Sequence, residues 1–401
     1  MAQRISRRAF LEVGAASVAL AAFPATARAQ GGVIRLGTLT PLTGSGGNYG
    51  PSMLKAMQWV AGEINAAGGV LTRKIELVSE DDQTNPEAGV RAARKLIDLD
   101  KVAAIMGTWA SAVTTAVAPL CWESKTFLTT VSGSDTITLL PHQGYLVRTQ
   151  PNTQLQGRKF AEFMVAQGSK RVAILAVQAP FALPTQKVVG EELKKRGAEL
   201  VAAVVYDKDK TTFRSEIDQA LKARPDMLYL NGYTPDVTIV LKDLYKAGYT
   251  AAKIAQAYAV NQKLLNALPP EVTDGTFTIA PSPAIESAAY KRLAQALGND
   301  DLDPYSCQTH DHISLVALAI AHAKGEATGT GIRDHVRKIS QGGGARVDSA
   351  VDGLRLLAQG KEINFDGASG PCDFNEIGDI LDTKFRYEQA EKGKFKLLKI
   401  A

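Results

Sequence analysis

The chain has 401 residues, of which 45% are hydrophobic and 22% charged, and its formal net charge is +5. A chain of this length is too long to fold around a single hydrophobic core, so we expect two globular domains. Three of the five net positive charges lie in residues 1–29, and the remainder has no basic run with interleaved aromatics. This distribution argues against a nucleic-acid-binding protein.

The N-terminal segment has the features of an export signal. Arg7 and Arg8 precede an apolar stretch that is too short for a permanent membrane span. Small residues then stand where a signal peptidase requires them. We therefore expect residues 1–29 to be a twin-arginine-type signal peptide that is cleaved after Ala29. The mature protein would begin at Gln30, with no cysteine there for a lipid anchor, and would reside free in the periplasm.

From residue 33 onward, short β-branched runs alternate with amphipathic helical patterns. The first series predicts strands at 33–39, 74–79, 102–106 and 127–131. One of the helices between them is marked by Asn85 as its N-cap and Pro86 at its first position. Alternation of this kind is typical of a parallel sheet that helices cover on both faces.

A second series of the same kind begins after Pro151. It predicts strands at 171–177, 200–206, 226–230 and 253–256, with Gly197 and Gly248 placed to end helices. Polar or proline-bearing stretches at 149–153, 280–284 and 363–371 are the best crossing points between the two halves. We therefore predict that lobe 1 comprises 30–150 and 284–364, and that lobe 2 comprises 151–283 and 365–401.

Three cysteines, Cys121, Cys307 and Cys372, are an odd number for an oxidising compartment. Such a set allows one disulfide at most and leaves at least one thiol unpaired. Two interpretations stay open at this point. Either Cys307 and Cys372 form a bridge, or all three residues are buried thiols.

Several motifs along the chain resemble the leucine/isoleucine/valine-binding family of periplasmic solute-binding proteins. The matching runs are Leu-Gly-Thr-Leu-Thr-Pro-Leu-Thr-Gly at 36–44, Tyr-Gly at 49–50, Glu-Ile-Asn-Ala-Ala-Gly-Gly at 63–69, Asp-Asp-Gln at 81–83, Arg-Thr at 148–149, Asn-Gly-Tyr at 231–233 and Gly-Ala-Ser-Gly-Pro at 367–371. The resemblance covers nearly all of residues 32–400. It implies an α/β, type I periplasmic-binding fold, in which two Rossmann-like lobes joined by a three-strand hinge close on a ligand.

The resemblance also implies a function and a set of partners. The protein would be a monomer without cofactor, metal or enzymatic activity. It would bind a small carboxylate-bearing molecule and deliver that molecule to the membrane permease of an ABC importer of the branched-chain amino acid type.

The same resemblance maps eight residues onto the ligand site. Those assigned to the ligand's carboxylate are Ser111, Gly133 and Ser134, and the aromatic positions are Tyr49, Trp109, Phe181, Tyr233 and Tyr258. Hydroxyls and N–H groups at helix N-termini form an anion site without a full cation. The alternative for both serines is a helix N-cap that touches no ligand. Aromatic walls supply area and shape with little loss of entropy.

One position departs from the amino acid binders of this family. Relatives that bind free amino acids carry an acidic residue after the strand matched here by 253–256, where it pairs with the ligand's ammonium group. This chain has Tyr258 nearby, which carries no charge at neutral pH. Because a buried, unpaired ammonium is strongly disfavoured, either Asp236 supplies the charge or the ligand lacks an amine. An aromatic or keto acid would satisfy the second alternative.

Two other functions compete with transport. A secreted enzyme would need a catalytic set that the sequence lacks: the loop at 44–50 misses the G-x-G-x-x-G spacing, and Ser52 with Lys55 fits S-x-x-K without its partner motifs. His310 and His312 do not converge on a metal, because successive helical residues point about 100° apart. A sensory binding protein of the same fold is not distinguished by sequence.

Overall fold

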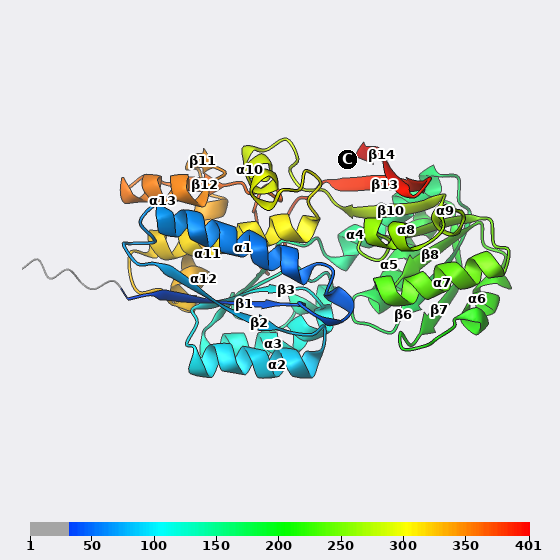
Figure 1. Ribbon diagram of the computed structural model, residues 1–401, viewed down its shortest axis with the longest axis horizontal. Coiled ribbons are helices and arrows are strands. Elements are labelled where there is room, and N and C mark those ends of the chain that lie inside the picture. Colours follow the sequence, from blue (N-terminus) through cyan, green and yellow to red (C-terminus); the bar gives the residue numbers. More distant parts are fainter. Residues whose placement is uncertain (1–31) are drawn as a thin grey trace, which may run out of the picture. The chain divides into compact units, whose positions relative to one another are not determined.

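The computed structural model describes residues 32–401, so the predicted signal peptide and its cleavage site lie outside the described residues. Two large β-sheets, each covered by helices, make up most of the described chain (Figure 1). The first sheet has the strand order β2-β1-β3-β4-β5, and all its neighbouring strands are parallel. The second has the order β14-β13-β10-β9-β8-β6-β7, with only β13 and β14 antiparallel to their neighbours. We call each sheet, with the helices that pack on it, a lobe.

The first lobe takes its large sheet from the N-terminal part of the described chain and several of its helices from residues 288–358. Its strands are β1 (Ile34–Thr40), β2 (Ile75–Asp81), β3 (Ala104–Thr108), β4 (Phe127–Thr130) and β5 (Leu146–Arg148). Its helices are α1 (Gly50–Ala66), α2 (Pro86–Arg94), α3 (Ser111–Ser124), α10 (Ala288–Leu297), α11 (Pro304–Ala323), α12 (Gly329–Ser340) and α13 (Ala350–Ala358). A two-stranded sheet of β11 (Ala345–Val347) and β12 (Ile363–Phe365) adjoins them. Helix α1 packs on α11 over one face of the sheet, and α2 packs on α3 over the other (Figure 1).

The second lobe repeats this architecture. Its strands are β6 (Arg171–Val177), β7 (Glu199–Tyr206), β8 (Met227–Asn231), β9 (Ala252–Gln256), β10 (Thr276–Pro281), β13 (Phe385–Glu391) and β14 (Lys394–Ile400). Its helices are α4 (Thr153–Ala166), α5 (Ala182–Lys195), α6 (Arg214–Leu221), α7 (Thr234–Lys246), α8 (Gln262–Ala267) and α9 (Pro270–Thr273). Helix α4 packs on α5, and α6 packs on α7.

The predicted strands and helix ends are confirmed. Every strand expected from sequence is present with its ends within two residues of the expected positions. Helix α2 begins at Pro86, and the side chain of Asn85 accepts a hydrogen bond from the Ala88 N–H at 2.9 Å. Gly197 and Gly248 follow α5 and α7 with φ of 74° and 70°, a backbone conformation that ends helices and that glycine adopts readily.

The third crossing between the lobes differs from its prediction. The sequence predicts that residues 365–401 belong to the second lobe, but residues 366–380 pack on the first. The Asp311 carboxylate, on α11, accepts backbone hydrogen bonds from Ala368 at 2.7 Å and Ser369 at 2.8 Å. Phe374 is buried in the core of the first lobe. The chain therefore changes lobe after residue 380, shortly before β13, and the predicted boundary at 364–365 is too early.

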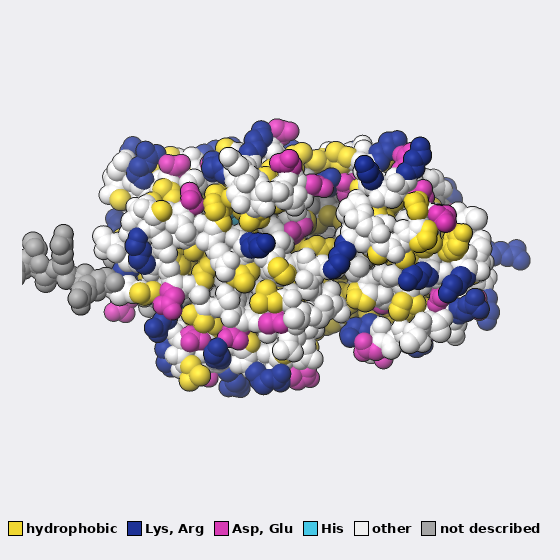
Figure 2. All heavy atoms as spheres, viewed as in Figure 1, with side chains coloured by type: hydrophobic (Ala, Val, Ile, Leu, Met, Phe, Trp, Pro, Cys, Tyr) yellow, Lys and Arg dark blue, Asp and Glu magenta, His cyan; other side chains and the backbone are white. Residues whose placement is uncertain are grey.

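The three cysteines are free, buried thiols. The bridge between Cys307 and Cys372 that the sequence left open is therefore not formed. Burial raises the pKa of each thiol well above its ordinary value, so the thiols are neutral. Within 32–401, no helix is both long and apolar enough to cross a membrane. Basic and acidic side chains are interspersed over the face drawn in Figure 2.

Candidate ligand-binding site

Loops from both lobes surround one cavity. Its lining comprises Trp109, Ala110, Ser111, Val131, Gly133, Gln150, Thr153, Gln156, Phe181, Thr185, Tyr233, Gln256, Tyr258 and Tyr305. These residues surround about 460 Å³ of space free of protein atoms, part of which is open to solvent. Most of them follow the carboxyl ends of parallel strands. Strand order reverses next to β1 and β6, and such a reversal opens a crevice that α/β proteins use for ligands.

One side of the cavity is formed by helix N-termini. Ser111 is the first residue of α3, and Thr153 is the first residue of α4. The first N–H groups of a helix have no acceptor within the helix, and the helix dipole places partial positive charge there. Two such ends at one cavity favour an anion without requiring a lysine or arginine.

Two of the three residues predicted to hold a carboxylate, Ser111 and Gly133, line the cavity. The Ser111 oxygen accepts a hydrogen bond from the Ser134 N–H at 3.2 Å, which leaves the Ser111 hydroxyl hydrogen free to donate to a ligand. Gly133 lines the cavity, and its N–H forms no hydrogen bond within the described part of the chain. A side-chain carbon at this position would meet the Gln156 amide nitrogen at 3.0 Å.

Ser134 is placed differently from its prediction. Its side chain is fully buried and does not line the cavity, and its hydroxyl pairs with the Thr136 hydroxyl at 2.9 Å. The residue contributes through its backbone N–H, which orients Ser111. The structure therefore does not favour contact between the Ser134 hydroxyl and a ligand, because this hydroxyl is buried and paired with Thr136.

Aromatic rings from both lobes form the opposite walls. The Trp109 ring lies 5.6 Å from Tyr258 and 5.8 Å from Tyr233, measured between ring centroids. Phe181 lies 5.2 Å from Tyr233 and 6.0 Å from Tyr258, in edge-to-face arrangements. Such edge-to-face packing is favourable for aromatic pairs. These four predicted aromatic residues are therefore brought together at the cavity.

Tyr49 lies next to the cavity and not in its wall. Its ring stacks on Trp109 at 5.9 Å, and it lines an adjoining groove between the lobes. The Tyr49 hydroxyl donates to the Tyr258 carbonyl at 3.0 Å and accepts from the Asn261 amide at 3.0 Å. Since Tyr49 belongs to the first lobe and Tyr258 to the second, the Tyr49 hydroxyl forms a hydrogen bond between the two lobes.

No residue that lines the cavity in the described chain carries a formal charge. Asp236, the nearest acid that sequence offered for an ammonium, lies outside the lining. Its carboxylate accepts hydrogen bonds from the Tyr233 N–H at 3.0 Å and the Tyr206 hydroxyl at 2.6 Å, and it caps α7. Burial raises the pKa of Asp236 to about 6, and the phenol of Tyr258 is held neutral by burial that raises its pKa.

Several lining residues were not predicted. Those at the start of α4 are Thr153 and Gln156, preceded by Gln150; the others are Thr185, Gln256 and Tyr305. The sequence held a signal for the first group, because polar residues cluster at the predicted crossing 149–153, where α4 begins. Tyr305 follows no strand, so an argument from strand ends could not find it. The Gln256 amide donates to the Tyr229 hydroxyl at 3.0 Å, which orients it at the cavity.

His310 and His312, both on α11, have separate partners. The His312 ring nitrogen Nε2 lies 2.8 Å from the Thr149 hydroxyl at the first crossing, and burial lowers its pKa to about 3. His310 stacks on Trp59 and pairs with the carboxylate of Asp311 at 2.7 Å. Their contacts are those of core residues that join α11 to its surroundings.

The sequence is similar to one protein family and to several characterised proteins. A family model described as "Periplasmic binding protein" matches residues 33–385. The chain is 27% identical to the Leu/Ile/Val-binding protein BraC3 of Rhizobium johnstonii, over 94% of this chain and 96% of that protein. It is 26% identical to the chemotactic signal transduction system substrate-binding protein BasB of Halobacterium salinarum, over 85% and 83% of the two chains.

Solved structures share the fold at lower identity. The leucine-binding protein LivK of Thermotoga maritima superposes with a TM-score of 0.78 at 21% identity, covering 92% of this chain and 98% of that chain. An ABC transporter solute-binding protein from R. palustris, in complex with benzoate, superposes with a TM-score of 0.75 at 16% identity, covering 92% and 96%. These likenesses establish a two-lobed, type I periplasmic-binding fold, as the sequence motifs predicted.

Proposed function

The chain belongs to the periplasmic binding protein family, and from this premise we propose that it captures a small carboxylate that lacks an amine, of the aromatic-acid class. The ligand is held between the two lobes and handed to the membrane permease of an ABC importer. The protein does not chemically change what it binds.

The observation that carries this proposal is the uncharged lining of the cavity. Helix N-termini, the Ser111 hydroxyl and the free Gly133 N–H suit a carboxylate. An ammonium would meet phenol rings and amides instead of a carboxylate, and burying an unpaired ammonium is costly. The absence of a lining acid therefore favours an acid without an amine over a free amino acid.

The aromatic walls favour a flat, unsaturated ligand. Trp109 and Phe181 present ring faces and edges that complement another aromatic ring. The R. palustris protein of the same fold is described in complex with benzoate, which supports this ligand class for the fold. Keto acids of similar size satisfy the same polar groups and form the second group to test.

We propose that binding occurs by closure of the lobes about the three crossings. The cavity takes Ser111 and Trp109 from the first lobe and Phe181 and Tyr233 from the second, so neither lobe alone forms it. The radius of gyration from small-angle scattering should fall on addition of a saturating ligand to protein freed of ligand by unfolding and refolding. An unchanged radius would contradict closure.

A thermal-shift screen tests the proposed ligand class. Refolded protein is mixed with benzoate, hydroxylated benzoates, phenylpyruvate, branched-chain keto acids, and the amino acids leucine, phenylalanine and valine. Because a ligand that binds only the folded state raises the melting temperature, an aromatic or keto acid should give the largest shift. A larger shift with any of the amino acids would contradict the proposal.

A sensory role is the second candidate. It is favoured by the similarity to BasB, whose name assigns that protein to a chemotactic system. The two roles differ in the partner of the closed protein, not in the cavity. Deletion of the gene should abolish uptake of the bound acid if the protein serves an importer. Normal uptake with lost chemotaxis toward that acid would favour the sensory role.

We further propose export to the periplasm by the twin-arginine route, with cleavage after Ala29, and a monomeric mature protein. The twin arginines Arg7 and Arg8 and the small residues before Gln30 support this route. N-terminal sequencing of periplasmic protein should read from Gln30. Export that persists when both arginines are changed to lysine would refute the route and leave the destination to the general secretory pathway.

A further inference from the structure

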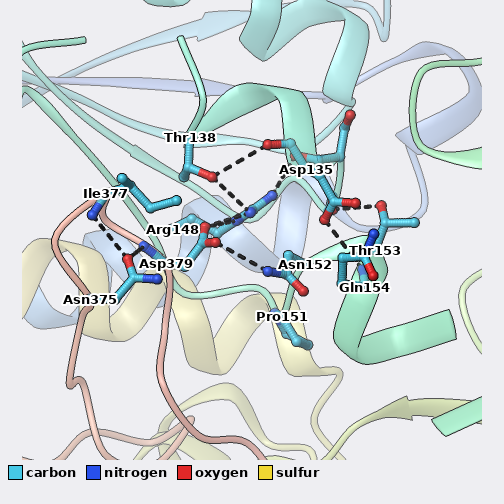
Figure 3. A network of polar contacts seen from close by, with 12 residues as sticks. Asp135, Thr138, Arg148, Pro151, Asn152, Thr153, Gln154, Asn375, Ile377 and Asp379 are labelled. Atoms are coloured by element: carbon cyan, nitrogen blue, oxygen red, sulfur yellow. Dashed lines mark hydrogen bonds and ion pairs between the residues drawn. The ribbon is translucent and has the colours of Figure 1, made fainter. Parts of the chain in front are cut away.

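Arg148 is the last residue of β5, and its side chain is completely buried without lining the cavity. Its guanidinium donates to one oxygen of Asp379, from Nε at 2.9 Å and from Nη2 at 2.5 Å. The remaining donors turn toward the loop that follows β4. Nη1 donates to the Ser134 carbonyl at 2.6 Å and Nη2 to the Thr138 hydroxyl at 3.1 Å (Figure 3).

These contacts fix the orientation of the peptide groups in that loop. Arg148 Nη1 also lies 3.4 Å from the Ser132 carbonyl. In a trans peptide the carbonyl and the following N–H point in opposite directions, and no cis peptide occurs in the described chain. A Ser132 carbonyl that faces Arg148 therefore directs the Gly133 N–H away from Arg148, and Gly133, like Val131 in the same loop, lines the cavity.

Asp379 connects this arrangement to the crossings between the lobes. Its second oxygen accepts a hydrogen bond from the Asn152 amide at 3.1 Å. The Asn152 side-chain oxygen caps α4 by accepting from the Leu155 N–H at 2.9 Å, and the first residue of α4, Thr153, lines the cavity. Figure 3 shows Asp379 between Arg148 and Asn152. One carboxylate thus holds both the loop after β4 and the start of α4.

We propose that Arg148, anchored by Asp379, is a positioning residue for the ligand's carboxylate. Arg148 turns the peptide group between Ser132 and Gly133 so that the Gly133 N–H is presented to the anion. Its charge is balanced by Asp379, so it acts through geometry and not as a direct counter-ion. This inference rests on the proposed function, because it takes the ligand to be a carboxylate.

A positioning role differs from a purely structural one in its dependence on the ligand's charge. If Arg148 only stabilised the fold, its replacement would weaken binding of a carboxylate and of the corresponding neutral amide alike. If Arg148 aims the Gly133 N–H, binding of the carboxylate should fall much more, because the bond to a charged group is the stronger of the two.

The test variants are Arg148→Lys and Asp379→Asn. Lysine keeps the positive charge and has no planar fork, so it cannot reach the Asp379 carboxylate, the Thr138 hydroxyl and the Ser134 carbonyl together. The control is Arg355→Lys, which alters an exposed ion pair with Asp352 at 3.0 Å, away from the cavity. Melting temperatures establish that each variant is folded before binding is measured.

Calorimetry compares benzoate with benzamide and leucine with leucinamide on the refolded full-length mature protein. Arg148→Lys and Asp379→Asn should each weaken binding of the carboxylate about tenfold or more, while the amide changes less than about threefold. Arg355→Lys should change neither. Equal losses for a carboxylate and its amide, or undiminished carboxylate binding by Arg148→Lys, would overturn the proposal.

Hydrogen–deuterium exchange makes the test independent of the ligand. In Arg148→Lys, exchange in a peptide that covers residues 131–138 should accelerate relative to strands of the second lobe, and in Arg355→Lys it should not. Unchanged exchange in this loop would overturn the proposal by itself. Failure of the unaltered protein to bind any tested carboxylate would instead refute the proposed function, while exchange would still decide whether Arg148 holds the loop.

Discussion

The two serines assigned to the ligand's carboxylate give the sharpest test of the site, because the structure separates their side chains. The Ser111 hydroxyl faces the cavity with a free hydrogen, whereas the Ser134 hydroxyl pairs with Thr136. Ser111→Ala should weaken binding of the preferred carboxylate by about 1.5–3 kcal/mol, the usual range for a hydrogen bond to a charged group. This corresponds to roughly a ten- to hundredfold loss in affinity.

Ser134→Ala is the matched control. It removes a neutral bond between two hydroxyls and keeps the backbone N–H that orients Ser111, so affinity should change less than about threefold. Stability should fall in both variants, because each leaves a polar group without its partner. Calorimetry at one salt concentration and pH measures both affinities. A loss in Ser134→Ala as large as that in Ser111→Ala would refute the assignment of the anion site.

Three further predictions concern closure, the aromatic wall and pH. Tyr49→Phe removes the hydrogen bond to the Tyr258 carbonyl that joins the lobes. The rate of ligand dissociation, measured by stopped-flow mixing, should therefore rise several-fold while ligand selectivity stays unchanged. An unchanged dissociation rate would contradict this role. Trp109→Ala should weaken binding of an aromatic acid by about 2 kcal/mol or more, measured by calorimetry, and equal affinity would place the ligand elsewhere. Burial raises the pKa of Asp82 to about 7 in the folded state. Between about pH 4 and pH 7, Asp82 is therefore protonated in the folded state and ionised in the unfolded state. The contribution of Asp82 to the free energy of unfolding falls as pH rises through this window. In urea unfolding, Asp82→Asn should therefore gain stability relative to the unaltered protein from pH 5 to pH 8, and a pH-independent difference would contradict this.

Eight parallel strands could be predicted because they are short runs rich in apolar or β-branched residues, whereas the parallel strands β5 and β10 were not predicted. Residues 171–177, for example, are matched by β6, and all but one of them are buried. The antiparallel strands β13 and β14 were not predicted because charged residues interrupt their apolar pattern, and most of β14 is exposed. The path of 366–380 could not be predicted, since it depends on hydrogen bonds to Asp311 from a different part of the chain.

The candidate site was predicted in outline. The family resemblance assigned Trp109, Ser111 and Gly133 to the ligand site, and all three residues line the cavity. The direction of a side chain within a turn is set by local packing, and that information was missing for Ser134. Tyr305 was missed because α11 enters the site by its N-terminal turn and not after a strand.

The central claim is that the cavity accepts a carboxylate and excludes the same molecule when it bears an α-ammonium group. Calorimetric titration of the refolded protein with two matched pairs tests this most directly: 3-phenylpropanoate against phenylalanine, and 4-methylpentanoate against leucine. Each pair differs only by the amine. Because the lining offers no acid to an ammonium, the amine-free member should bind at least about a hundredfold more tightly in the pair whose skeleton fits. Tighter binding of phenylalanine or leucine than of its amine-free partner would contradict the account.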